Sequence, residues 1–120
     1  EKAKEVLKTN LKAIEYVKNG ISIFIFPEGT GNKGEELSLL PFKDGAFRIA
    51  TKTGCPIVPV SLNNTADILE NHFPHIKKTH VVIEYGKPIY PNELDAETKK
   101  HIGAYVQNIV QKTINKNAEI

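Results

Sequence analysis

The residues best suited to binding chemistry lie in a glycine-rich stretch, residues 28–34, that directly follows an apolar run. Lys43 and Arg48 come shortly afterwards and add two positive charges. Backbone N–H, hydroxyl and ammonium groups together bind anions, and phosphate fits this set best. Glu28 would repel a phosphate, but its carboxylate accepts hydrogen bonds from an alcohol. The donors within the stretch are the N–H groups of Gly29, Thr30 and Gly31, the hydroxyl of Thr30 and the ammonium of Lys33.

On the residues alone, an anion site competes with a simpler interpretation, a glycine-rich connection with solvated lysines. Two known phosphate-binding motifs are excluded. Gly29-x-Gly31-x-x-Gly34 has the glycine spacing of a dinucleotide fingerprint, but the segment that follows ends at Pro41 and is not an apolar helix. The phosphate loop that closes on Gly-Lys-Ser/Thr is excluded because Glu35 follows the last glycine.

Other reactive side chains give weaker signals. His72, His75 and His80 lie close together in the sequence, but they fall in a predicted loop, whereas metal sites usually stand on rigid elements. We therefore expect surface histidines and no metal site. Cys55 is the single cysteine, so an internal disulfide is excluded. Because no histidine lies near Cys55 in the sequence to activate it, a small buried residue is expected there.

The composition is that of one soluble globular domain, with 120 residues, 40% of them hydrophobic and 25% charged. The net charge is only +2 and Arg48 is the single arginine, so no nucleic-acid partner is expected. The longest apolar run, residues 21–26, is far shorter than the roughly 20 residues of a membrane-spanning helix.

Hydrophobic periodicity predicts alternating helices and strands. Residues 21–26 are apolar at nearly every position, which is typical of a parallel strand buried on both faces. Pro59 within the second strand implies a bulge or a sheet edge. The predicted elements are a helix at 2–18, a strand at 21–26, a short helix that Asp44 caps and Gly54 ends, a strand at 56–62, one or two helical turns within 65–70, a strand at 79–85 and a helix from Asp95 to about 115. This order predicts an α/β fold with a small, mostly parallel or mixed sheet and flanking helices.

Three linked segments carry a family resemblance. They are Ile23-Phe-Ile-Phe-Pro-Glu-Gly-Thr30, Leu40-Pro-Phe-Lys-Asp-Gly-Ala-Phe-Arg-Ile-Ala50 and Cys55-Pro-Ile-Val-Pro-Val60. In this order and at this spacing, the chain resembles the phospholipid/glycerol acyltransferase family, and within it the 1-acyl-glycerol-3-phosphate acyltransferases. That family has four sequence blocks, of which the third and fourth are present here. The resemblance implies that residues 1–120 are the C-terminal part of such a domain, without its first and second blocks.

The resemblance implies transfer of a fatty acyl group from acyl-CoA or acyl carrier protein to a hydroxyl of a glycerol-3-phosphate-type acceptor, in phospholipid biosynthesis. The family's general base is a histidine with an aspartate five positions later. No histidine of this chain has an aspartate at that position. No catalytic residue is therefore expected in this chain, and the isolated fragment is predicted to be inactive. The positions five after the four histidines hold Lys77, His80, Tyr85 and Val106.

The resemblance also assigns substrate-binding positions. Pro27, Glu28, Gly29 and Thr30 fall on the acceptor-binding block, and Pro59 falls in the fourth block, which lines the acyl or acceptor pocket. The family's arginine after the threonine is replaced by Gly31 in this chain. Lys33 and Lys43 are the candidates to replace that arginine as point charges.

The implied partners are a glycerophospholipid acceptor, an acyl donor and, for the full-length protein, a membrane surface on its cytoplasmic side, with no bound cofactor. The fragment itself is expected to be soluble. Missing upstream strands would leave an exposed hydrophobic patch, or a dimer that covers it. Two alternatives stay open, a non-catalytic phosphate- or lipid-headgroup-binding α/β module and an α/β interaction domain without an anion site.

Overall fold

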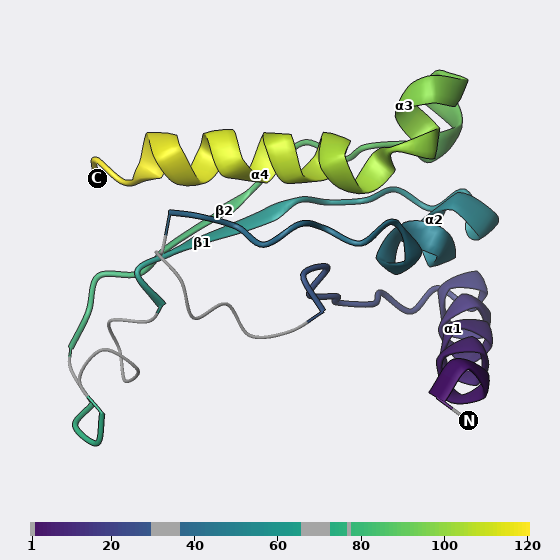
Figure 1. Cartoon of the computed structure of the whole chain (residues 1–120), viewed down its shortest axis with the longest axis horizontal. Helices are drawn as coiled ribbons and strands as arrows, with labels where there is room; N and C mark the ends of the chain where they lie inside the picture. Colours follow the sequence, from purple (N-terminus) through teal and green to yellow (C-terminus); the bar gives the residue numbers. More distant parts are fainter. Residues whose placement is uncertain (1, 30–36, 66–72, 77) are drawn as a thin grey trace.

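The computed structural model describes residues 2–29, 37–65, 73–76 and 78–120. Its elements are α-helices (α), 3₁₀ turns (η) and β-strands (β). In chain order they are α1 Lys2–Lys18, η1 Asp44–Phe47, α2 Arg48–Thr53, β1 Val60–Asn63, β2 Val82–Tyr85, η4 Pro91–Glu93, α3 Ala96–Lys100 and α4 Ile102–Asn117. The long α4 lies over the β1–β2 pair, while α1 and α2 lie together at one end of the molecule (Figure 1).

The two strands pair antiparallel, with Val60 opposite Tyr85 and Asn63 opposite Val82. A further antiparallel bridge joins Ile57 to Ile89 through two hydrogen bonds of 2.7 Å. The α/β class is confirmed, but a mostly parallel sheet is wrong for the described strands. The third predicted strand begins later than expected, at Val82.

Pro59 separates the Ile57 bridge from β1. Proline has no N–H to give to a partner strand, so the ladder is interrupted where Pro59 stands. The carbonyl oxygen of Pro59 still accepts a hydrogen bond of 2.8 Å from the backbone N–H of Gly86. The interruption that this proline predicts within the strand is therefore confirmed.

The hydrophobic core is a stripe along α4 packed against η1. Ile102, Val106, Val110 and Ile114 recur every four residues, face the sheet and are buried with Phe47. The partly buried residues around this stripe are Leu39, Phe42, Ala46, Ile57, Ile89 and Leu94. The apolar periodicity of the last helix therefore coincides with its buried face at these four positions, whereas Tyr105 beside them is 39% exposed.

Both ends of α4 are tied to distant parts of the chain. At the C-terminal end, the Glu84 carboxylate of β2 accepts hydrogen bonds from Lys116 and Asn117. These bonds, the one from Lys116 above all, hold the pKa of Glu84 below its usual value. At the N-terminal end, the Asp44 carboxylate accepts a hydrogen bond of 2.8 Å from the backbone N–H of Gly103.

That last contact corrects one prediction. Asp44 makes no side-chain cap for its own short helix; it satisfies one of the open N–H groups in the first turn of α4 instead. The single long helix predicted from Asp95 is also wrong, because the backbone turns at His101 and separates α3 from α4. Asp95 does cap α3 as predicted, and its carboxylate accepts a hydrogen bond of 2.7 Å from the Thr98 N–H.

Residues 21–26 differ most from expectation. They follow α1, which has its predicted bounds, and Gly20, which is left-handed at φ +85°, but they form no strand. Their side chains are exposed, Phe24 by 65% and Phe26 by 71%. Within the described residues no neighbouring strand pairs with this segment, so its aromatic side chains stay in solvent. The exposed hydrophobic patch predicted from the sequence is therefore present.

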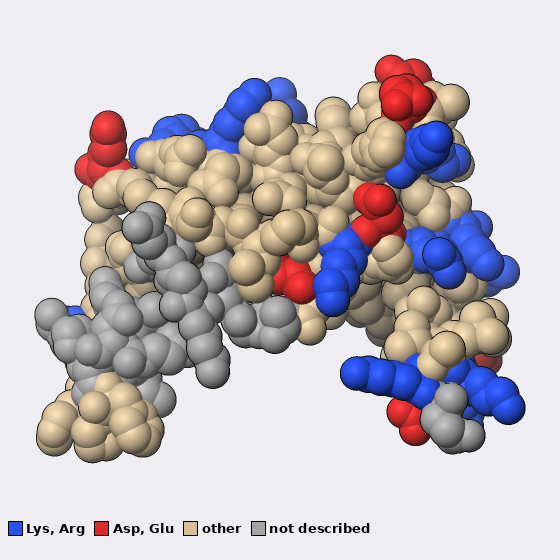
Figure 2. Space-filling view, in the orientation of Figure 1, with Lys and Arg blue, Asp and Glu red and all other residues tan. Residues whose placement is uncertain are grey.

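The charged side chains are unevenly distributed. Figure 2 shows lysine and arginine gathered at the end of the molecule where α1, α2 and α3 lie, and again along α4. The broad face between them carries few charges in this view. The helical turns predicted within 65–70 fall mainly on residues 66–72, which lie outside the described part of the chain.

Candidate functional site

The centre of the candidate site is a tight turn at Pro27, Glu28 and Gly29. The Gly29 N–H donates to the Phe26 carbonyl oxygen at 3.2 Å and closes the turn. Gly29 has φ +76°, a conformation that side chains with a Cβ rarely adopt. The turn therefore requires glycine at this position for a local, backbone reason.

A second segment lies directly against this turn. The backbone N–H of Lys43 donates a hydrogen bond of 3.0 Å to the Pro27 carbonyl oxygen. A Cβ added at Gly29 would lie 3.0 Å from Nζ and 3.3 Å from Cε of Lys43. The lysine side chain thus lies across the glycine, and both are exposed, so the ammonium stands beside the open backbone of the turn.

Glu28 joins the same two segments from the other direction. Its Oε2 accepts a hydrogen bond of 2.7 Å from the backbone N–H of Leu40. A short bond to a charged acceptor is among the stronger hydrogen bonds in proteins. Glu28 is half-buried and therefore helps to hold the 37–43 segment in place, a role the sequence did not indicate.

Four of the seven predicted substrate-binding residues lie together. Pro27, Glu28 and Gly29 are consecutive in the turn, and Lys43 lies against them. Pro59 is buried directly before β1 and lies beside Gly86, and no contact between Pro59 and the turn is seen among the hydrogen bonds of the described residues. Thr30 and Lys33 lie outside the described residues.

Sequence reasoning missed two contributors on α4. Gln107 and Gln111 hydrogen-bond to the backbone of the 37–43 segment, which also bonds to Glu28 and Pro27. The available signal was their spacing of four, beside the apolar stripe of α4. That spacing shows which face they occupy, but not which segment lies against it.

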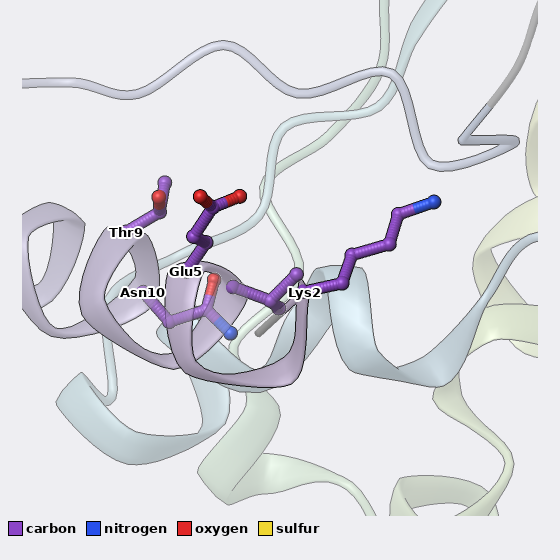
Figure 3. A pocket seen from close by; sticks show the side chains of 5 residues that line it. Lys2, Glu5, Thr9 and Asn10 are labelled. Atoms are coloured by element: carbon purple, nitrogen blue, oxygen red, sulfur yellow. The ribbon is translucent and has the colours of Figure 1, made fainter.

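A recess of about 310 Å³ lies on α1 and is lined by Lys2, Glu5, Val6, Thr9 and Asn10 (Figure 3). Every lining residue belongs to this one helix, so the recess is an open groove between its side chains. It lacks the converging groups from several elements that a ligand site needs.

Two absences hold for the residues that the structure describes. No group of three or more histidine, cysteine or carboxylate side chains is placed to hold a metal ion among them. No helix among them has the length and apolar character needed to cross a bilayer. Cys55, expected to be buried, is half-buried.

The comparison with known sequences falls on these same segments. Residues 1–63, which include the turn and Lys43, match the family model described as Acyltransferase. The chain belongs to the acyltransferase family. The predicted family relationship is therefore confirmed, over a region that ends with β1.

Curated relatives carry a more specific name. The chain is 33% identical over 120 residues to the 1-acyl-sn-glycerol-3-phosphate acyltransferase of Saccharomyces cerevisiae, covering 99% of this chain and 39% of that protein. It is 44% identical over 87 residues to the chloroplastic 1-acyl-sn-glycerol-3-phosphate acyltransferase BAT2 of Brassica napus, covering 70% of this chain and 24% of the relative.

A solved structure agrees with both. The 1-acyl-sn-glycerophosphate acyltransferase PlsC of Thermotoga maritima superimposes with a TM-score of 0.77 at 28% identity. The match covers 91% of this chain and 44% of that protein. This chain thus spans less than half the length of these relatives.

Proposed function

We propose that the complete protein containing this chain transfers a fatty acyl group to the free hydroxyl of a 1-acyl-glycerol-3-phosphate, and that the turn at residues 27–29 with Lys43 binds the acceptor. The observation that carries this proposal is the contact between Lys43 and Gly29, which places an ammonium against an open backbone turn. A phosphate monoester is the anion that such a set of donors favours. The names of the matching relatives support the same acceptor class.

The chemistry divides between this chain and the rest of the protein. A histidine general base takes the proton of the acceptor hydroxyl, the oxygen attacks the acyl carbonyl carbon, and the donor's thiol leaves. The histidine–aspartate pair of the family is absent from this sequence. In this proposal the chain supplies acceptor binding, with Lys43 as the point charge for phosphate and Glu28 fixing the segment that carries it.

The exposed segment 21–26 supports the proposal that the chain is a partial domain. Six residues without charge, glycine or proline, directly before the binding turn, have the composition of an inner strand. Their exposure is accounted for if the remaining part of the domain supplies the neighbouring strand. The matching relatives are long enough to do so, because this chain spans 39% of the yeast protein.

The donor and the location follow from the same proposal. An acyl thioester, acyl-CoA or acyl carrier protein, supplies the acyl group, and the product is a phospholipid precursor. A lipid acceptor resides in a bilayer, so the complete enzyme works at a membrane surface, on the cytoplasmic side where the donor is made. In this proposal the complete enzyme is held at that surface either peripherally or by segments outside this chain.

The direct test replaces Lys43 by methionine in the complete protein. Loss of an ion-assisted hydrogen bond is expected to raise the KM for lysophosphatidate about tenfold or more, with little change in the KM for the acyl donor. Lys52→Met, an exposed lysine on α2, is the matched control and is expected to leave both constants unchanged. An unchanged acceptor KM for Lys43→Met would contradict the assignment. In the same assay the 120-residue chain alone is expected to show no turnover.

A further inference from the structure

A polar stripe runs along α4 beside its buried apolar stripe. Gly103, Gln107 and Gln111 recur every four residues, so they lie on one face of the helix. All three bond to one segment far away in the sequence, residues 37–44. This segment belongs to no helix or strand until η1 begins, so its backbone depends on such contacts for hydrogen bonding.

The two glutamine side chains replace the partner strand that the segment lacks. Gln107 accepts a hydrogen bond of 2.9 Å from the Phe42 N–H. Gln111 accepts one of 3.3 Å from the Leu39 N–H and donates one of 2.5 Å to the Leu37 carbonyl oxygen. A primary amide that accepts from one peptide and donates to another two residues away reproduces the pairing of a strand edge.

The match depends on spacing. Four helical residues advance about 6 Å, and two residues of extended chain advance about 6.6 Å. Gly103 bonds to the side chain of Asp44, Gln107 to the backbone of Phe42 and Gln111 to the backbone of Leu39, so steps of four on α4 meet steps of two and three on the segment. The helix therefore sets the register of the segment along its length.

The same segment carries the groups of the acceptor site. Phe42 directly precedes Lys43, whose backbone bonds to Pro27. Leu39 directly precedes Leu40, whose N–H bonds to the Glu28 carboxylate. Each amide held by α4 is thus next to one held by the binding turn, and the segment is fixed from both sides.

We propose that Gln107 and Gln111 are positioning residues for acceptor binding, Gln107 by holding Lys43 in register with the turn and Gln111 by holding the Leu40 N–H against Glu28. This inference rests on the proposed function of the same site. Neither glutamine touches the acceptor; both act through the backbone of the segment between them.

The test uses acceptor and donor kinetics of the complete protein. Gln107→Met keeps the shape of the side chain but removes its acceptor, and Gln111→Met removes both bonds to the segment, together with one to Asn115 on the same helix. Each is expected to raise the lysophosphatidate KM roughly 2- to 10-fold, the range that loss of one hydrogen bond gives, while the donor KM is unchanged. Asn108→Met, an exposed position on the same helix, is the matched control.

Substitution by glutamate separates the two positions. Gln107 only accepts in this structure, so Gln107→Glu keeps the bond to Phe42 and is expected to retain a wild-type acceptor KM. Gln111 also donates to a carbonyl oxygen, so Gln111→Glu places two acceptors together and is expected to behave like Gln111→Met or worse. A merely structural loss would lower the amount of active enzyme without changing KM.

The outcomes are distinct. Wild-type transfer with an unchanged acceptor KM in both methionine variants would overturn the positioning role and leave the proposed function standing. Equal behaviour of the two glutamate variants would overturn the assignment of accepting and donating roles. If the wild-type protein transfers no acyl group to lysophosphatidate, the proposed function fails, and this inference fails with it.

Discussion

The two halves of this molecule differ in how far their apolar side chains are buried. On the α4 side, four apolar side chains at helical spacing are buried against η1 and the sheet, and Ile114 is only 3% exposed. On the α1 side, no helical residue is buried and the following segment, 21–26, exposes its aromatic rings. Both sides have sequences of high apolar content, so composition does not explain the difference.

The difference teaches that an amphipathic pattern specifies a face but not its partner. The apolar face of α4 is buried within the described residues, whereas α1 is only partly covered, by α2, and residues 21–26 stay exposed. The candidate site lies at the boundary, since Pro27 and Gly29 end the exposed segment and Lys43 begins the packed one. The proposed acceptor site therefore lies where a buried region of the chain meets an exposed one.

The largest expected effect comes from comparing the loss of a buried side chain on α4 with the loss of an exposed one in segment 21–26. Ile114→Ala removes a buried side chain and is expected to lower the free energy of unfolding by about 2–5 kcal/mol. Phe24→Ala removes a larger side chain that is 65% exposed, and is expected to change it by about 0.5 kcal/mol or less. Urea denaturation of the 120-residue chain compares the two. Similar losses for both variants would show that the 21–26 segment is packed after all.

A second pair of variants examines how tightly the packed half is closed. A Cβ at Gly103 would lie 2.4 Å from the Phe42 carbonyl oxygen and 2.7 Å from Oδ1 of Asp44, closer than real side chains approach. Gly103→Ala is therefore expected to cost about 1–3 kcal/mol of stability. Gly45→Ala, where nothing lies within 4 Å, is expected to be neutral or to stabilise by up to about 1 kcal/mol. Thermal unfolding of the two variants tests these expectations. If Gly103→Ala caused no loss of stability, α4 and the 37–44 segment would not be tightly packed together.

The smallest expected effect is the loss of stability on removing Asp95, the exposed N-terminal cap of α3. The hydrogen bond from the Thr98 N–H holds the pKa of Asp95 below its ordinary value of 3.8. A carboxyl whose pKa is lower in the folded state stabilises the fold above pH 3.8, and this contribution is lost as the pH falls through the folded pKa. The stability difference between wild type and Asp95→Ala is thus expected to shrink below pH 3.8. A difference that stays constant from pH 7 to pH 2 would argue against this cap.

Much of the fold was predictable because its signals are local. The bounds of α1, the left-handed Gly20 and Gly54, and the cap at Asp95 depend on residues within one turn of each other. Pro59 predicted its own interruption of the strand for the same reason. These features need no knowledge of the rest of the chain.

The wrong predictions concern features whose structure depends on a segment far away in the sequence. Asp44 is a good local cap by residue type, yet the N–H of Gly103 takes its carboxylate. The break at His101 lies next to Gly103, which packs closely against Phe42, and no periodicity in the sequence records that contact. The segment 21–26 has every mark of a buried strand, but burial requires a neighbour that the described residues do not supply.

For the candidate site, the sequence identified the turn and Lys43 but not what holds them. Motif resemblance named Pro27, Glu28 and Gly29, and the structure places Lys43 against them. Their role in binding remains a prediction. Gln107 and Gln111 were not identified, because a polar residue beside an apolar stripe usually faces only water.

The segment 21–26 has a consequence for the behaviour of the chain at high concentration. Ile-Ser-Ile-Phe-Ile-Phe is a six-residue run of strong strand formers with no charge and no proline, and it is open to solvent. Such runs are the units that stack into cross-β assemblies when identical chains meet. The residues that suit an inner strand therefore also give this polypeptide, while they stay exposed, the sequence signature of ordered aggregation.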